Sequence, residues 1–235
     1  MISIVTGTLN RLELLKKVIE NTVGSSNLIE LVLVDGGSTD GTIEYLRSLN
    51  HPQIKLIEVG GRSTYPHYMN LGIKNSKYEV IGQWNDDVLI CNDWNDVIKE
   101  IDVSDYYMFP WTRGTLYEFE KNKDEIFNKQ RFLFGGCMNF GLYKKSVFRK
   151  IGLYDSRFKY YWCDSDMTER CIRFGLKRKE LHNVRVMEIT SIDNNDVKIE
   201  KRTEPDENNY GRILLENNKF SYSIGIIPPT VEYLK

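Results

Sequence analysis

The sequence has no apolar run long enough to cross a membrane. The longest apolar stretch near the N-terminus, residues 28–34, is interrupted by Glu30 and is far shorter than the ~20 residues that span a bilayer. Residues 1–9 have neither a basic segment nor a long apolar core. We therefore expect neither a membrane-spanning segment nor a secretory signal.

Cysteine is scarce, and its spacing excludes common metal and redox motifs. No C-x-x-C pair occurs, which argues against zinc ribbons and thioredoxin-like sites. Because no export signal is expected, we predict free thiols and a cytoplasmic location. The four cysteines are Cys91, Cys137, Cys163 and Cys171.

Neither sign of charge is in excess. The 32 basic and 33 acidic residues leave a formal net charge of −1, so no broadly basic surface for nucleic acid is expected. The 235 residues are 41% hydrophobic, which excludes a wholly disordered or fibrous chain. This length suits one large α/β domain or two small ones.

Over the first ninety residues, short apolar runs alternate with segments of helical spacing. This alternation predicts a mostly parallel sheet with helices on both faces. The expected strands are residues 2–6, 28–34, 54–59 and 78–83, and the expected helices start near Leu12, Asp40 and Pro66.

The alternation weakens after Asp87. Residues 112–131 are dense in polar side chains, and we predict that they are mobile without ligand and become ordered over an acceptor. Further expected elements are strands at 106–110 and 184–189, helices at 144–150 and 164–174, and a polar loop or linker at 193–209.

Ligands of open parallel sheets bind at the carboxyl ends of the strands. The first candidate there is V-D-G-G-S-T-D-G-T at residues 34–42. Asp35 can accept hydrogen bonds from a nucleobase or ribose, and the glycines allow close approach to the backbone. We favour ligand contact for Asp35 and helix capping for Asp40. The string matches neither a dinucleotide-binding nor a P-loop fingerprint.

The second candidate is the acidic pair Asp86–Asp87, directly after the fourth expected strand. Adjacent carboxylates repel each other unless a positive charge lies beside them. Mg²⁺ or Mn²⁺ bridging a diphosphate would supply that charge. A solvated acidic turn is the alternative, with about equal weight.

The third candidate opens a late helix, where three aromatic residues at 160–162 precede Asp164 and Asp166. Acidic residues in a first helical turn are often only partners of the helix dipole. The aromatic run, however, suits a pocket for sugar rings and would raise the pKa of Asp164 by desolvation. For Arg62, phosphate pairing and an ordinary surface position have equal weight.

Together these motifs resemble family 2 glycosyltransferases with the GT-A fold. The resemblance covers residues 1–190 and includes the V-D-G-G-S-T-D-G-T variant of the donor signature. The other matching elements are the Thr/Asn-bearing loop at 4–11, Asn70-Leu71-Gly72-Ile73, the D-x-D-like Asn85-Asp86-Asp87, and Cys163-Asp164 before a helix with Arg170, Arg173 and Gly175.

The resemblance implies a fold and a domain plan. The expected fold is a single Rossmann-like α/β domain over residues 1–190, with a mostly parallel central sheet flanked by helices. Residues 1–100 would form the nucleotide-sugar half and 101–190 the acceptor half, followed by a C-terminal extension at 191–235.

The resemblance also implies roles for individual residues. Asp164 would be the general base, Asp87 a ligand of Mn²⁺ or Mg²⁺, and Glu188 would take the place of a late metal-side histidine or leave that role unfilled. Cys163 departs from the family pattern, because an acidic residue usually precedes the base. With Arg62 and Trp162 added from their positions in the sequence, the expected donor-binding residues are Thr6, Thr8, Asn10, Arg11, Asp35, Gly37, Ser38, Arg62, Asn70 and Asp86, and the acceptor side would include Gly135, Gly136 and Trp162.

The resulting hypothesis is an inverting, metal-dependent glycosyltransferase of glycan or surface polysaccharide synthesis. Its acceptor could be a glycan, a lipid-linked sugar or a protein, and peripheral membrane association and homo-oligomers stay open. The alternatives are a non-catalytic nucleotide-sugar or glycan-binding module, which the Cys163 departure keeps open, and a nucleotidyltransferase. For the latter, residues 7–11 match a Gly-rich phosphate loop poorly.

Overall fold

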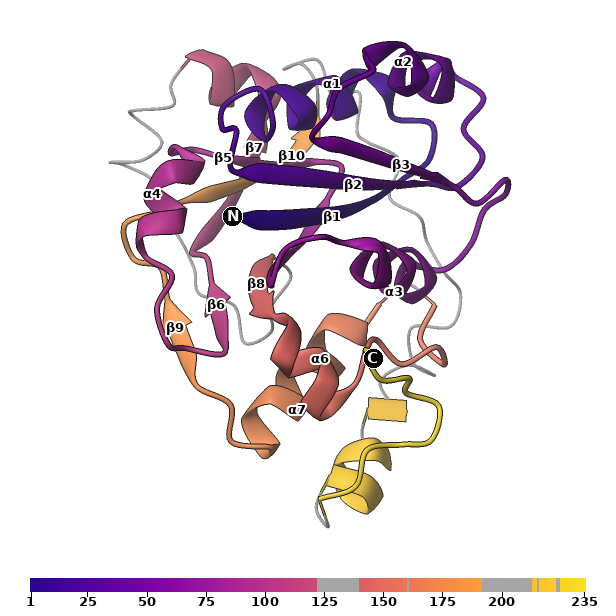
Figure 1. The fold of residues 1–235 in the computed structure, drawn as a ribbon, viewed down its shortest axis with the longest axis vertical. Helices are drawn as coiled ribbons and strands as arrows, with labels where there is room; N and C mark the ends of the chain where they lie inside the picture. Colours follow the sequence, from indigo (N-terminus) through magenta and orange to yellow (C-terminus); the bar gives the residue numbers. More distant parts are fainter. Residues whose placement is uncertain (122–139, 160, 192–212, 215, 223–224) are drawn as a thin grey trace.

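The computed structural model describes residues 1–121, 140–159, 161–191, 213–214, 216–222 and 225–235 (Figure 1). Within these ranges, no helix is both long and apolar enough to cross a bilayer.

The main sheet has the strand order β3-β2-β1-β4-β8-β6-β9 in the described part of the chain. Its first four strands run parallel to one another, whereas β8 is antiparallel to both of its neighbours. The predicted mostly parallel sheet is therefore confirmed. The strands are β1 (Ile2–Thr8), β2 (Ile29–Asp35), β3 (Ile54–Glu58), β4 (Val80–Asn85), β6 (Tyr106–Met108), β8 (Gly141–Lys144) and β9 (Arg178–Glu180).

Helices cover both faces of this sheet, as predicted (Figure 1). Side chains alternate between faces along each strand, so Ile4 packs in the cluster with α1 and α2, whereas Val5 packs with α3, α6 and α7. The helices are α1 (Leu12–Asn21), α2 (Thr42–Leu49), α3 (Tyr65–Asn75), α4 (Trp94–Lys99), α6 (Lys145–Ile151) and α7 (Cys163–Arg173).

A second sheet, not predicted from the sequence, joins β5 (Val88–Ile90), β10 (Val186–Ser191) and β7 (Trp111–Thr115) in that order. The polar stretch that we expected to be mobile thus begins inside a strand that pairs with β10. Residues 116–121 are helical, and residues 122–131 lie outside the described ranges.

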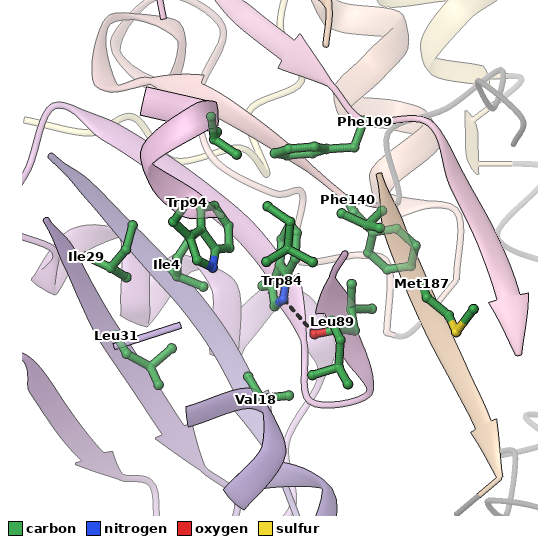
Figure 2. Packing of buried hydrophobic residues seen from close by; sticks show 14 of the residues in the cluster. Ile4, Val18, Ile29, Leu31, Trp84, Leu89, Trp94, Phe109, Phe140 and Met187 are labelled. Atoms are coloured by element: carbon green, nitrogen blue, oxygen red, sulfur yellow. Dashed lines mark hydrogen bonds between the residues drawn. The ribbon is translucent and has the colours of Figure 1, made fainter. Parts of the chain in front are cut away.

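Aromatic packing fixes the corner between β4 and β5. The Trp84 indole donates a hydrogen bond of 2.9 Å to the carbonyl of Val88, and its ring lies against Trp94, Phe109 and Phe140 (Figure 2). Such edge-to-face contacts add to the stability gained by burial. Asp86 and Asp87 lie in this corner, so the packing of Trp84 in the hydrophobic core fixes the backbone that carries them.

The described part of the C-terminal extension packs against the α6–α7 side of the domain (Figure 1). Leu153 donates a backbone hydrogen bond of 2.7 Å to Glu232, and Leu234 donates one of 3.4 Å to Phe148. A short π-helix, η1 (Asn217–Ser221), belongs to this segment.

Candidate active site

A cavity of about 380 Å³ lies at the carboxyl ends of β1 and β4. This is the edge of a parallel sheet where ligands bind. The sequence-predicted residues that the structure brings together around it are Thr8, Arg11, Asp86, Asp87, Trp162, Asp164 and Glu188.

Arg11 joins both aspartates of the β4–β5 corner. Its Nη1 lies 2.8 Å from Asp87 Oδ2 and 3.3 Å from Asp86 Oδ1. Burial lowers the pKa of Arg11, but the two carboxylates outweigh it and leave the pKa raised. Thr8 Oγ1 donates a further hydrogen bond of 2.9 Å to Asp86 Oδ2. Asp86 is thereby held from two sides.

The Asp87 carboxyl is the group best placed to accept a cation. Burial and the neighbouring Asp86 raise its pKa to about 6, although Arg11 opposes the shift. Its Oδ1 atom is buried and has no hydrogen-bond partner. An orphaned carboxylate oxygen in a buried position is costly, and a hard dication prefers such a ligand. The donor set therefore fits Mg²⁺ or Mn²⁺.

Glu188 lies beside this corner because β10 pairs with β5 so that Glu188 is opposite Val88. Its carboxylate accepts a hydrogen bond of 2.7 Å from Arg113 Nε. Among the described residues, no three His, Cys, Asp or Glu side chains are already arranged to hold a metal ion. In this structure the positive charge beside Asp86, Asp87 and Glu188 comes from Arg11 and Arg113.

Asp164 approaches the same cavity from the first turn of α7. The Ser165 amide donates a hydrogen bond of 2.8 Å to its Oδ1. Trp162, just before the helix, has a left-handed backbone with φ of 69° and a side chain that is partly exposed. Burial raises the pKa of the Cys163 thiol well above its usual value, so this residue is neutral where a carboxylate was expected.

Neutral hydrogen-bonding groups also line the cavity, and none of them was assigned a role from the sequence, although Asn85 belongs to the Asn85-Asp86-Asp87 element. Gln83 Nε2 donates to Tyr65 Oη over 2.9 Å, and Tyr65 Oη donates to Asn85 Oδ1 over 3.2 Å. Burial raises the pKa of Tyr65 well above its usual value, so the hydroxyl stays protonated. The available signal was position, since Gln83 ends the fourth expected strand and Asn85 lies two residues after it.

Arg113 was also missed. It lies in β7, inside the polar stretch that we had expected to be mobile, and it lines the cavity. Its guanidinium lies over the Trp111 ring, 5.1 Å from the ring centre. No motif marks Arg113 in the sequence, because only the pairing of β7 with β10 brings it to the site.

The Asp35 side chain accepts hydrogen bonds within the turn that follows β2, at residues 35–38. Its buried carboxylate accepts hydrogen bonds of 2.8 Å from the Gly37 amide, 2.8 Å from the Ser38 amide and 2.6 Å from Ser38 Oγ. Gly37 has a φ of 86°, which glycine adopts readily. These contacts shape the loop, and direct contact of Asp35, Gly37 or Ser38 with a ligand stays a prediction.

Two further side chains hold this loop against the β1–α1 loop. The Asn10 backbone amide donates a hydrogen bond of 2.9 Å to Ser38 Oγ, and the Asn10 side-chain Oδ1 accepts one of 2.7 Å from the Thr39 amide. Asp40 accepts hydrogen bonds of 3.1 Å from both Leu12 and Thr42, the first residues of α1 and α2. The predicted capping by Asp40 is therefore wrong in position, because Gly41 is the cap residue of α2 and Asp40 binds the Thr42 amide from one residue earlier.

The remaining predicted residues do not line the cavity. Thr6 is buried within β1, Arg62 is exposed on the β3–α3 loop, and the Asn70 side chain exchanges hydrogen bonds of 2.8 and 2.9 Å with the Tyr154 backbone. Their contact with a donor stays a prediction. Gly135 and Gly136 lie outside the described residues.

Comparisons with known proteins agree with this architecture. The family model described as Glycosyl transferase family 2 matches residues 3–152, a range that ends before α7. A search of curated proteins gave no match.

Two solved structures share the fold. The mannosyltransferase PcManGT from Pyrobaculum calidifontis, in complex with GDP-Man and Mn²⁺, has a TM-score of 0.62 and 17% identity over 97% of this chain and 66% of its own. S. aureus TarS 1–349, in complex with UDP-GlcNAc, has a TM-score of 0.58 and 16% identity over 79% of this chain and 58% of its own. The chain thus spans less than two thirds of either structure.

Proposed function

Because the chain belongs to glycosyl transferase family 2, we propose that it transfers a sugar from a nucleotide-diphosphate sugar to a hydroxyl group of an acceptor. One observation carries the proposal. A single cavity is lined both by an acidic pair with two arginines and by a separate carboxylate, Asp164, which follows an exposed tryptophan in sequence. Sugar transfer needs both sets of groups, one for the leaving diphosphate and one for the attacking hydroxyl.

The diphosphate would bind beside the acidic pair Asp86 and Asp87. Asp87, through its unpartnered Oδ1, and Asp86 would hold Mn²⁺ or Mg²⁺ there. When bound, such a cation neutralises the charge that develops on a leaving diphosphate. The Mn²⁺ in the mannosyltransferase complex supports this choice of cofactor.

Arg11 and Arg113 would bind the diphosphate oxygens. Both now pair with carboxylates that line the cavity, Arg11 with Asp86 and Asp87, and Arg113 with Glu188. A guanidinium can exchange a carboxylate for a phosphate without losing its charge-assisted hydrogen bonds. The two side chains would thus stabilise the leaving group even though the chain as a whole has a formal net charge of only −1.

Asp164 would act as the general base. A carboxylate within hydrogen-bond reach of the acceptor hydroxyl takes its proton as the oxygen attacks the anomeric carbon. The Ser165 amide fixes one carboxylate oxygen, which limits rotation of the group. Direct displacement inverts the anomeric centre, so the enzyme would be inverting.

The Trp162 ring would form a wall for the acceptor or the transferred sugar. It is 42% exposed and precedes Asp164 by two residues. Aromatic faces pack well against the apolar face of a sugar ring. We place the reaction in glycan or surface polysaccharide synthesis, in the cytoplasm, with a glycan, lipid-linked or protein acceptor.

A panel of nucleotide-diphosphate sugars tests the proposal. Thermal shift with and without Mn²⁺ identifies the donor, since the stabilisation by a specific ligand rises with the logarithm of its concentration above Kd. Release of the nucleoside diphosphate is then measured with candidate acceptors and with water. Donor binding without release under any condition would favour a non-catalytic binding module. Release of pyrophosphate from a nucleoside triphosphate incubated with a sugar 1-phosphate, in place of the donor, would favour a nucleotidyltransferase.

A further inference from the structure

The carboxylate of Asp166 is fully buried in the first turn of α7, two residues after Asp164. It accepts three hydrogen bonds, at 3.0 Å from Arg170 Nε, 2.9 Å from Asn217 Nδ2 and 2.5 Å from Tyr222 Oη. Arg170 belongs to the same helix, whereas Asn217 and Tyr222 belong to the C-terminal extension. A buried carboxylate depends on such donors, because it has lost its hydration.

The Asn217 and Arg170 side chains also connect α7 to the residues that precede it in the chain. Asn217 Oδ1 accepts a hydrogen bond of 2.6 Å from Arg157, whose guanidinium also pairs with the buried Asp155 at 2.5 Å. Arg170 Nη1 donates to the Ile151 carbonyl over 2.6 Å. The extension thereby ties the start of α7 to the segment that leads into it.

The segment that this network supports contains an unfavourable backbone conformation. Trp162 has a φ of 69°, in the left-handed region that bulky residues avoid. Its carbonyl accepts the hydrogen bond of 2.9 Å from the Asp166 amide, the first bond of the helical turn. A strained residue keeps its conformation only where neighbouring contacts hold it. Asp166 makes those contacts, because its amide binds the Trp162 carbonyl and its carboxylate binds the C-terminal extension.

Tyr222 is suited to this task over a wide pH range. Burial, with Asp166 next to it, raises its pKa far above the usual value, so the hydroxyl remains a donor. Its ring also contacts Phe174 at the end of α7, with the ring centres 6.5 Å apart. Tyr222 therefore touches both ends of the helix.

We propose that Tyr222 and Asn217 are positioning residues, which hold the first turn of α7 so that Asp164 and Trp162 face the cavity. The proposal rests on the function proposed above, because it assigns a purpose to the orientation of Asp164. Neither residue lines the cavity, so neither is expected to touch substrate. The C-terminal extension would then be part of the catalytic domain rather than an appendage.

The central variant is Tyr222→Phe, which removes one hydrogen-bond donor and keeps the ring against Phe174. Asn217→Ala removes a second donor independently. Tyr233→Phe is the matched control, because Tyr233 lies in the same extension and is 49% exposed. We expect both test variants to lower kcat by roughly 10- to 100-fold, as small misplacements of catalytic groups do, with nucleotide affinity by calorimetry unchanged.

Hydrogen–deuterium exchange supplies a readout that does not depend on activity. Amides of residues 161–168 should exchange faster in both test variants than in the control, at a temperature well below the melting point. Exchange and kcat equal to those of Tyr233→Phe would overturn the proposal. A loss of nucleotide affinity as large as the loss of kcat, together with a lower melting temperature, would also overturn it, since these changes indicate a purely structural role.

Asp164→Asn separates this proposal from the proposed function. Full turnover in Asp164→Asn would reject Asp164 as the base, and faster exchange in Tyr222→Phe would still establish control of the turn by the extension. Loss of turnover in Asp164→Asn with unchanged exchange and kcat in Tyr222→Phe would reject the positioning role and leave the proposed function intact.

Discussion

Tyr68 occupies the space that a side chain at Gly36 would need. A Cβ atom placed on Gly36 would lie 2.3 Å from the Tyr68 hydroxyl oxygen, and one on Gly7 would lie 2.9 Å from the Tyr68 ring. The hydroxyl also accepts a hydrogen bond of 2.6 Å from the Ser63 amide. The first glycine of the V-D-G-G string is thus required by a buried tyrosine that lines the cavity.

We expect Gly36→Ala to destabilise the protein by about 1–3 kcal/mol, the usual cost of overpacking. Tyr68→Phe removes the clashing oxygen, so the double variant should lose less than the sum of the two single variants. Urea unfolding of all four proteins measures this coupling. Gly61→Ala is the control, because nothing lies within 4 Å of a Cβ at that position. Additive losses would contradict the packing argument.

Asp164→Asn should keep donor binding and lose roughly 10²–10⁴-fold in turnover, the range typical of general base catalysis. The amide keeps the shape of the side chain but cannot accept the proton. Release of nucleoside diphosphate and calorimetry measure the two quantities. Glu169→Gln, on the same helix in an exposed pair with Arg173, should retain turnover. Wild-type turnover in Asp164→Asn would remove Asp164 from the role.

Asp87→Asn should weaken nucleotide binding in the presence of Mn²⁺ and have little effect in its absence. The reason is that the variant removes the negative charge of the carboxylate whose unpartnered oxygen a cation would bind. Calorimetry with the nucleoside diphosphate, with and without Mn²⁺, gives the difference. Asp96→Asn, in an exposed pair on α4, should behave as wild type. Equal Mn²⁺ dependence in the two variants would count against Asp87 as a ligand.

The same carboxyl should affect stability as pH changes. Its pKa is about 6 in the folded chain, against about 3.9 when unfolded, so between these values the folded state binds more protons. The contribution of Asp87 to the free energy of unfolding therefore falls as pH rises from about 4 to about 6. As pH rises over that interval, the free energy of unfolding of Asp87→Asn should fall less than that of the wild type. Urea unfolding with a chelator present measures it, and parallel curves would refute the shift.

Arg113→Ala should lower kcat by about 10²-fold, since single groups that stabilise developing charge contribute on that scale. Arg113 lines the cavity and pairs with Glu188 at 2.7 Å. Arg47→Ala removes an exposed ion pair with Glu58 outside the cavity and should leave kcat unchanged. Steady-state kinetics with the identified donor decide between them. Similar small effects in both variants would exclude Arg113 from leaving-group stabilisation.

The sequence predicted those parts of the fold that depend on local periodicity. Ile4 and Val5 face opposite layers because side chains alternate along a strand, and the alternation of strands and helices implied those layers. It also located Asp86, Asp87 and Asp164, because strand ends and helix starts can be found from local patterns.

The parts it missed depend on contacts between distant segments. β7 is too polar to resemble a buried strand, and its pairing with β10 brings Arg113 to Glu188 across 75 residues. Asn70 shows a second limit, because an amide suits a donor sugar and a backbone equally well, and only the fold places Tyr154 beside it. Side-chain chemistry alone could not separate these uses.

Arg11 has a consequence for the order in which ligands arrive. It bridges Asp86 and Asp87, so it serves as an internal counter-ion that a lone dication would have to displace without compensation. A dication that arrives together with a diphosphate offers the displaced guanidinium a new anionic partner. At the site proposed above, cation and nucleotide would thus be thermodynamically coupled through one side chain, and by reciprocity each would raise the affinity of the site for the other.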